Sequence, residues 1–333
     1  MFKEILKLIE KKKRFVITSH VRPDGDAIGS AAALGAYLNR LGKQADVILS
    51  DPPPPNLFWL ANQLQVQTFD GGIEQRSKIA FADVIFVVDV NTLDRVGALA
   101  RPIKESNATK VLIDHHLDPE NWFDHKAVNV RSTSTGELIY QLIHGHRPEQ
   151  INHDIATALY TAIMTDTGSF RFDSVVADTH RIAADLIERG DLFPSDIHLK
   201  VFDNKAAAAL RLLGMSLETL TLAYDDQVGY MSVTQEMIRK TGCHTSETEG
   251  FVNMILSIGS VKVGVMFLEI EKGVKMSFRS KGEWAVNKWA SRFGGGGHRN
   301  ASGAFVKDGI LEVVQRQVHQ LAPESIPQWP KDL

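Results

Sequence analysis

This 333-residue sequence has a single cysteine, no long apolar run and no excess of basic charge. Its one cysteine, Cys243, excludes an internal disulfide bond and is typical of a reducing compartment. No stretch approaches the roughly 18 apolar residues that span a bilayer, and the charged N-terminus lacks the apolar segment of a secretory signal. With 37 basic and 40 acidic side chains, the formal charge of −3 argues against binding of long duplex nucleic acid, though not of short nucleotides. We therefore expect a cytoplasmic protein with no membrane partner.

Apolar strand segments alternate with helical segments through about residue 190, which predicts βαβ units and a parallel sheet. The expected strands cover residues 14–19, 45–49, 84–90 and 111–113. Residues 191–222 are expected to form a mostly helical connector. After it, strand candidates and helices are mixed differently. We therefore predict an α/β protein with a parallel-sheet domain over residues 1–190 and a smaller mixed-sheet α/β domain over residues 223–325.

Acidic and histidine side chains follow these strands and the helix expected over residues 154–164. The carboxyl ends of parallel strands are where open α/β sheets bind ligands. The candidates at this edge are His20, Asp24, Asp26, Asp89, Asp114, His115, His116 and Asp166. Taken singly, several have structural explanations: Asp24 could fix a turn, Asp26 could cap the helix expected from Ile28, and Gly25 and Gly29 could let the backbone bend.

The hypothesis of a metal site depends on the whole set. Carboxylates gathered without cations repel one another, and their pKa values rise. Two divalent ions would balance the four negative charges of Asp24, Asp26, Asp89 and Asp166. Mixed oxygen and imidazole ligands without a thiolate favour two Mn²⁺ ions, with Co²⁺, Fe²⁺ or Mg²⁺ as alternatives. Two such ions are the usual means of hydrolysing phosphate esters, because they generate hydroxide and hold the attacking and leaving oxygens.

These motifs together resemble those of the DHH phosphoesterase superfamily. The resemblance is carried by the pattern from His20 through Asp24-Gly25-Asp26, the strand-borne Asp89, the triplet Asp114-His115-His116 and the late Asp166. The string GGGGHRNASG from residue 294 to residue 303 is similar to the glycine-rich motif of the DHH-associated C-terminal domain. The size resembles that of stand-alone members that degrade short oligoribonucleotides (nanoRNA) to mononucleotides and dephosphorylate 3'-phosphoadenosine 5'-phosphate (pAp) to AMP. The resemblance implies short single-stranded RNA and pAp as substrates, and it is compatible with a homodimer.

The resemblance also implies roles for individual residues. One metal would be held by His20, Asp24 and Asp89. The other would be held by Asp26, Asp89, His115 and Asp166, with Asp89 bridging the two. His116 would contact the scissile phosphate or the leaving oxygen, and Asp114 would orient an imidazole from behind.

Substrate contacts are predicted in both domains, with the active site in a cleft between them. In the second domain, the backbone of Gly295, Gly296 and Gly297 could approach an anion beside His298, and Arg279 could bind phosphate. In the first domain, the candidates are Arg131, Ser134 and Arg95. Each has a competing explanation. The glycines could form a flexible turn, the arginines could be solvated, and Ser134 could cap a helix with Glu137 as its capping-box partner.

Other activities stay open at this point. A phosphodiesterase acting on pApA or cyclic di-AMP would share the catalytic half. A nucleotide-binding sensor without turnover belongs to a different class, and the complete ligand set argues against it. A pyrophosphatase of the same superfamily would carry a Ser-Arg-Lys motif that this sequence lacks. A RecJ-like exonuclease would usually be longer.

Overall fold

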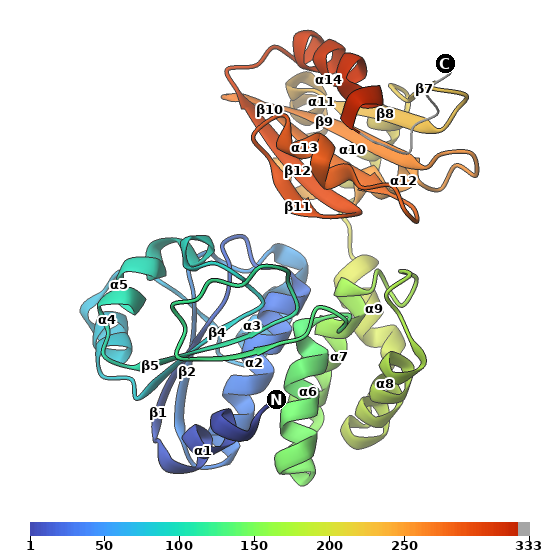
Figure 1. Ribbon diagram of the computed structural model, residues 1–333. Coiled ribbons are helices and arrows are strands. Elements are labelled where there is room, and N and C mark those ends of the chain that lie inside the picture. The colour runs from blue at the N-terminus through green and yellow to red at the C-terminus, as the bar shows by residue number, and fades with distance from the viewer. Residues whose placement is uncertain (326–333) are drawn as a thin grey trace. The chain divides into compact units, whose positions relative to one another are not determined.

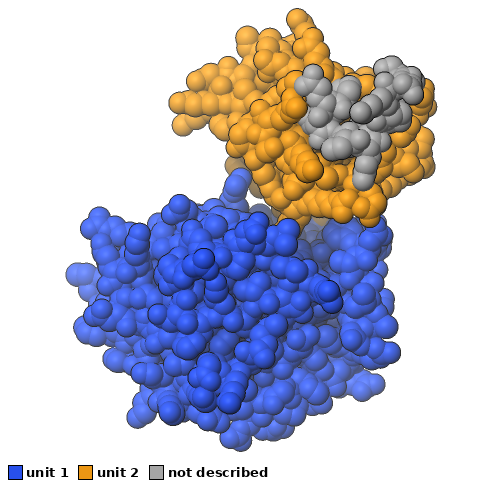
Figure 2. All heavy atoms as spheres, viewed as in Figure 1, with its two compact units in different colours: residues 1–204 blue, residues 205–333 orange. Residues whose placement is uncertain are grey.

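The computed structural model describes residues 1–325 and divides the chain into two compact units, residues 1–204 and residues 205–333 (Figure 2). The division falls within residues 191–222, the segment expected to connect two domains. Two helices lie in that segment, α9 (Pro194–Phe202) in unit 1 and α10 (Ala207–Leu217) in unit 2.

Unit 1 is built on a six-stranded sheet in which every pair of neighbouring strands is parallel. The strand order is β3-β2-β1-β4-β5-β6. The strands are β1 (Arg14–Thr18), β2 (Gln44–Leu49), β3 (Gln67–Thr68), β4 (Val84–Val88), β5 (Thr109–Asp114) and β6 (His125–Val128). The order reverses between β1 and β4, and ligands of open α/β sheets bind at such a switch point. The predicted parallel-sheet α/β fold is therefore confirmed for this unit.

Helices cover both faces of this sheet (Figure 1). The pleat of β1 shows the division, because Phe15 and Ile17 enter one hydrophobic core and Val16 enters the other. The larger core lies under α1 (Lys3–Lys11), α2 (Gly25–Arg40), α3 (Phe58–Gln63), α6 (Thr135–His146), α7 (His153–Asp166), α8 (Ala177–Gly190) and α9. The smaller core lies under α4 (Ile73–Ala80), α5 (Ala100–Glu105) and the 3₁₀ segment η2 (Leu93–Leu99).

Helix α2 begins at Gly25, three residues before the expected start at Ile28. Asp24 is its N-cap and accepts hydrogen bonds from two backbone amides of the first turn, so Asp26 is not the capping residue. The expectation that glycines serve backbone bending here is wrong. A Cβ on Gly25 would lie 2.2 Å from Thr165 Oγ1 and one on Gly29 would lie 2.4 Å from the Ala158 carbonyl oxygen, so both glycines let α2 pack closely on α7.

This packing gives a stability prediction. Gly29→Ala should lower the free energy of unfolding by about 1–3 kcal/mol, because the backbone carbonyl of α7 cannot move aside for the added methyl group. Gly145→Ala is the matched control, since Gly145 is also helical but a methyl group added there would meet no neighbouring atom within 4 Å. It should raise stability by about 0.5–1 kcal/mol. Urea unfolding followed by circular dichroism measures both, and an equal effect of the two changes would contradict the packing argument.

Unit 2 has a six-stranded mixed sheet, as predicted, with the order β11-β12-β10-β9-β8-β7. Only β8 and β9 pair in parallel among its described strands. The strands are β7 (Thr221–Ala223), β8 (Val228–Val233), β9 (Val263–Ile270), β10 (Gly273–Ser280), β11 (Gly296–His298) and β12 (Ala301–Lys307). The helices are α10, α11 (Gln235–Thr241), α12 (Phe251–Ile255), α13 (Val286–Ser291) and α14 (Leu311–Ser325). Trp289 is fully buried in the core between this sheet and α13.

The glycine-rich string is partly a strand. Gly296, Gly297 and His298 form β11 and pair with Ser302 and its neighbours in β12. Gly295 lies so close to β12 that a Cβ there would meet the Gly303 carbonyl oxygen at 2.1 Å. The alternative of a flexible turn is therefore replaced by a short edge strand whose glycines permit close backbone contact.

Within residues 1–325, we find no helix that is both long enough and apolar enough to cross a membrane.

Candidate metal centre

His20 lies two residues beyond β1, at the carboxyl edge of the sheet. Its side chain is buried, and its Nδ1 donates to the Val21 carbonyl oxygen at 2.9 Å. The Nε2 atom therefore faces the carboxylates, 3.4 Å from Asp89 Oδ2 and 3.8 Å from Asp24 Oδ1. An imidazole that donates one ring N–H to a carbonyl and turns the other nitrogen toward carboxylates has the tautomer that metal-binding histidines adopt.

Asp89 follows β4 directly and lies beside His20 because β1 and β4 are neighbours. Its φ of 57° is in the left-handed region, which aspartate tolerates better than most residues. The side chain is buried, and its two oxygens face different partners. Oδ2 faces His20, whereas Oδ1 lies 3.6 Å from His115 Nε2. A carboxylate placed in this way can serve two cations at once.

Asp26 lies in the first turn of α2, and the N-terminus of α6 surrounds its carboxylate. Oδ2 accepts from the Thr135 amide at 2.7 Å. Oδ1 accepts from the Gly136 amide at 2.9 Å and from the Ser30 hydroxyl at 3.0 Å. Because each carboxylate oxygen has two acceptor positions, Oδ1 is saturated and Oδ2 keeps one position. Oδ2 is also the oxygen that faces His115 Nε2, at 3.9 Å.

The triplet after β5 sends its side chains in different directions. Nδ1 of His115 donates to the Ser132 carbonyl oxygen at 3.2 Å, and its Nε2 lies 3.4 Å from Asp166 Oδ2. His116 instead uses Nδ1 to bond Asp114 Oδ1 at 2.7 Å. Asp114 itself is fully buried. The two consecutive histidines are therefore not equivalent in their contacts.

Distances between ligand atoms group the side chains into clusters suited to cations. One cluster contains His20, Asp24 and Asp89, and a second contains Asp26, His115 and Asp166. Within each cluster the ligand atoms lie within 4.8 Å of one another. Asp89 also forms a group with His115 and His116, so it lies close to ligands of both clusters. In that group His116 Nδ1 already bonds Asp114, which makes it a weaker candidate ligand.

The electrostatics of the cluster are those of a site that attracts positive charge. Burial and the neighbouring carboxylates raise the pKa of Asp26 and of Asp166 well above the usual range, as predicted for crowded acids. Burial disfavours protonation of His20, but hydrogen bonding and attraction to Asp24 and Asp89 outweigh it and raise the pKa of His20 to about 10. Burial also disfavours ionisation of Asp89, yet the surrounding imidazoles lower the pKa of Asp89. The predicted rise in pKa is therefore wrong for Asp89, because three histidines surround this carboxylate.

The other predicted residues divide between the two units. Arg95 and Arg131 are exposed in unit 1, and the charge of Arg95 acts on His116 to oppose protonation. Ser134 is buried and caps α6 by accepting from the Glu137 amide at 3.2 Å, but the Glu137 carboxylate accepts from Ser132 and Thr133 instead of the Ser134 amide, so only half of the expected capping box forms. In unit 2, Arg279 lies near the end of β10, and its Nη1 donates a hydrogen bond to the Phe278 carbonyl oxygen. The glycines and His298 lie in or beside β11, with the backbone of Gly296 and Gly297 exposed.

Two contacts in the cluster's surroundings are not predictable from the sequence. The Ser132 carbonyl oxygen orients His115, and the Thr135 hydroxyl donates to Asp89 Oδ1 at 3.1 Å. The capping box at Ser134 predicts a helix N-terminus with amides available to an acid. Nothing in the sequence indicates that Asp26, more than a hundred residues away, is that acid.

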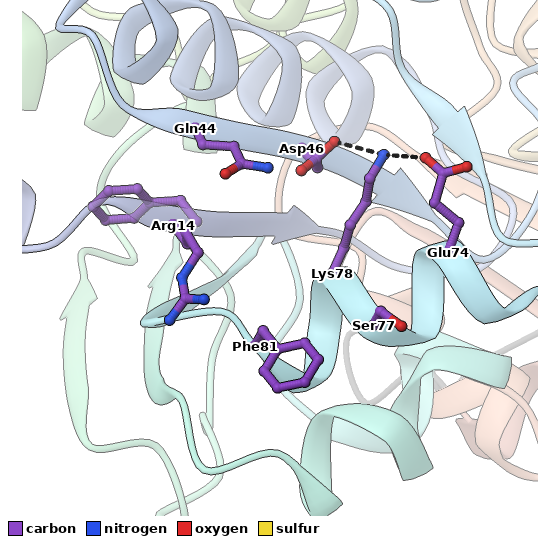
Figure 3. A pocket seen from close by; sticks show the side chains of 8 residues that line it. Arg14, Gln44, Asp46, Glu74, Ser77, Lys78 and Phe81 are labelled. Atoms are coloured by element: carbon purple, nitrogen blue, oxygen red, sulfur yellow. Dashed lines mark ion pairs between the residues drawn. The ribbon is translucent and has the colours of Figure 1, made fainter.

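A hollow of about 350 Å³ lies at the other edge of the unit 1 sheet and contains no member of the cluster (Figure 3). Arg14 and Gln44, at the starts of β1 and β2, line it together with residues of α4. Lys78 lies between Asp46 and Glu74, with its Nζ 3.0 Å from a carboxylate oxygen of each. Because parallel strands direct ligands to their carboxyl ends, this hollow at the amino end does not compete with the cluster as a catalytic site.

Comparison with known proteins identifies the class of protein. The family model "DHH family, N-terminal domain" matches residues 14–163, and the model "DHHA1 domain" matches residues 225–322. A crystal structure of an exopolyphosphatase-related protein from Bacteroides fragilis is 32% identical, with a TM-score of 0.91 and coverage of 97% of both chains. The chain therefore belongs to the DHH superfamily and carries a DHHA1 domain. It is a DHH-family phosphoesterase with a His and Asp cluster suited to metal binding.

Individual relatives are more distant in sequence. Several share the name bifunctional oligoribonuclease and PAP phosphatase NrnA. The one from Thermus thermophilus is 29% identical over 97% of this chain and 93% of its own length, and the one from Bacillus subtilis is 26% identical over 91% and 92%. The cyclic-di-AMP phosphodiesterase PdeA of Listeria monocytogenes is 23% identical over 93% of this chain but 47% of its own length.

Proposed function

We propose that this protein is an Mn²⁺-dependent phosphohydrolase that degrades short oligoribonucleotides to mononucleotides and dephosphorylates pAp to AMP. The observation that carries the proposal is the pair of carboxylate and imidazole clusters that meet at Asp89. The names of the relatives from Thermus thermophilus and Bacillus subtilis, which match nearly end to end, support the choice of substrates. The mixture of oxygen and imidazole ligands without thiolate supports Mn²⁺.

In this proposal His20, Asp24 and Asp89 hold one cation, and Asp26, Asp89, His115 and Asp166 hold the other. Bound divalent ions supply an activated water and neutralise the phosphate oxygens. The tautomers of His20 and His115, fixed by the Val21 and Ser132 carbonyl oxygens, point Nε2 of each ring into the clusters.

His116 is proposed to act on the substrate rather than on the metals. Its Nδ1 bonds Asp114 Oδ1 at 2.7 Å, and we propose that the other ring nitrogen, Nε2, approaches the scissile phosphate or the leaving oxygen. Burial disfavours its protonated form, but hydrogen bonding and attraction to Asp114 and the charge of Asp89 raise the pKa of His116. A group that keeps its proton in this way can donate it to the leaving oxygen.

Substrate contacts are also part of the proposal. Arg95 and Arg131 in unit 1 are exposed cations that suit phosphate, whereas Ser134 is the weaker candidate because its side chain is buried and caps α6. In unit 2 we propose contacts from Arg279 and from the exposed backbone of the glycine-rich strand next to His298.

The test is a turnover panel with Mn²⁺ that contains pAp, dinucleotides, longer RNA, cyclic dinucleotides and pyrophosphate. We expect AMP and phosphate from pAp, and mononucleotides from dinucleotides. If both substrates stay intact, the proposal is wrong. If metal-dependent turnover is absent but nucleotides still bind in a titration, the protein is a sensor.

A pApA or cyclic-di-AMP phosphodiesterase is the second candidate. The similarity to PdeA supports it, because the match covers 93% of this chain, although only 47% of PdeA. Faster turnover of cyclic di-AMP or pApA than of pAp and mixed dinucleotides would select this alternative.

Metal binding itself should be visible as stabilisation. We expect Mn²⁺ to raise the midpoint of thermal unfolding, because the ion binds the folded cluster and not the unfolded chain. At a free concentration of 100 times the dissociation constant the gain is about 2.7 kcal/mol. Ca²⁺, which prefers oxygen ligands alone, is the control and should stabilise less. If Mn²⁺ is added to protein that a chelator has stripped of metal and the unfolding midpoint does not change, the proposed site is wrong.

A further inference from the structure

Thr135 contacts both of the carboxylates that lie deepest in the cluster. Its hydroxyl donates to Asp89 Oδ1 at 3.1 Å, and its backbone amide donates to Asp26 Oδ2 at 2.7 Å. All three residues are almost completely buried, with Thr135 at 0% exposure. One residue at the start of α6 therefore joins an acid from the end of β4 to an acid from α2.

The hydroxyl of Thr135 has no part in capping its own helix. Ser134 is the N-cap, and its side chain accepts from the Glu137 amide. The amides of Thr135 and Gly136 are already used by Asp26. The bond from the hydroxyl to Asp89 is thus additional to what the helix needs, and its acceptor comes from a different strand.

The contact also determines how Asp89 is presented. A carboxylate oxygen accepts at two positions, and the hydroxyl of Thr135 takes one of the two on Oδ1. Oδ1 keeps one acceptor position and faces both histidines after β5, with His115 Nε2 at 3.6 Å and His116 Nδ1 at 3.8 Å. Oδ2, on the side of His20, has no contact with Thr135 among the hydrogen bonds of the described residues. The hydroxyl therefore acts on one side of the cluster.

We propose that Thr135 is a positioning residue that fixes Asp89 Oδ1 and so sets the affinity of the cation site formed by Asp26, Asp89, His115 and Asp166. This inference rests on the proposed metal site and adds a residue that controls it. Hydrogen-bond partners that orient metal ligands typically change metal affinity by about 10–100-fold when removed.

The experiment measures Mn²⁺ binding by calorimetry on metal-free protein, so that it does not depend on turnover. Thr135→Val removes the hydroxyl and keeps both the shape and the backbone amide. We expect one of two Mn²⁺ binding events to weaken about 10–100-fold and the other to stay as in the unchanged protein. Thr135→Ser keeps a hydroxyl and should restore the weakened event.

Thr157→Val is the matched control. Thr157 is also buried and lies in α7, and its hydroxyl has no hydrogen-bond partner within residues 1–325. Mn²⁺ binding should be unchanged in this variant. Thermal unfolding in the presence of chelator checks that each variant is folded, and Thr135→Ala replaces Thr135→Val if the valine variant does not fold.

The outcomes separate the two proposals. If the unchanged protein binds no Mn²⁺, the proposed metal site is wrong. If it binds two ions and the valine variant binds both equally well, the role of Thr135 is wrong while the site stands. Equal weakening in the serine and valine variants would also overturn that role, because the hydroxyl would then not be the cause.

Discussion

Asp89→Asn is expected to abolish Mn²⁺-dependent turnover, with a loss of at least about 1,000-fold in kcat/KM. The amide that replaces the carboxylate has the same shape but only one oxygen. Since Oδ1 faces His115 and Oδ2 faces His20, one side of the cluster always meets an NH₂ group instead of an oxygen. This loss exceeds the 10–100-fold typical of hydrogen-bond partners around a metal, because a shared ligand is removed. It corresponds to roughly 4 kcal/mol at 1.36 kcal/mol for each factor of ten.

Asp83→Asn is the control for this change. Asp83 lies just before β4 as Asp89 lies just after it, and its carboxylate accepts from the Lys13 and Arg14 amides at the amino edge of the sheet. Turnover should be close to that of the unchanged protein. Steady-state kinetics and Mn²⁺ calorimetry on both variants make the comparison. Full activity in Asp89→Asn would refute the proposed mechanism.

The two consecutive histidines should respond differently to substitution. His115→Ala should lower Mn²⁺ occupancy, because the Nε2 of this ring faces both Asp89 and Asp166. His116→Ala should keep the metals and lose turnover by about 10²–10⁴-fold, the range typical of a group that transfers a proton. Metal analysis after dialysis, combined with kinetics, distinguishes the two results.

His144→Ala is the control for the histidine pair. His144 is exposed on α6 and stacks on Tyr140 away from the cluster. Neither metal content nor turnover should change. Equal metal loss in the His115 and His116 variants would contradict the division of roles.

The candidate site can be predicted from the sequence where an acid or a histidine directly follows an apolar strand. The run Val84–Val88 is apolar on both faces, so the acid that follows it stands out. The same holds for the histidines after β5. These patterns are local, and they are enough to predict the parallel sheet and its ligand-bearing edge.

Elements with few buried side chains are not predictable in the same way. Helix α4 buries only Gln75 and Ile79, and strand β6 buries only Ala127. Helix α11 has no buried residue, so it carries no periodic apolar pattern. The start of α2 escapes prediction for a different reason. Gly25 is a poor helix former, and a glycine is needed there because the backbone of α2 packs closely on α7. Only the folded chain reveals this contact.

The residues that orient the cluster are hidden from the sequence because their partners are distant along the chain. Thr135 occurs in a run of serine and threonine that has the composition of a turn. Its acceptor is Asp89, and its amide serves Asp26. Polar contacts between residues so far apart in the sequence depend on which helix end meets which strand end. Hydrophobic periodicity carries no information about that.

The order of the strands has a consequence for biosynthesis. The cluster draws on His20 after β1, Asp89 after β4, His115 after β5 and Asp166 at the end of α7. A chain emerging from the ribosome therefore cannot complete the second cluster until the last of these has been translated and α7 has docked on α2. In the proposed metal site, a nascent chain that ends before Asp166 lacks one ligand of the second cluster, so the second cation would bind only after α7 has been translated.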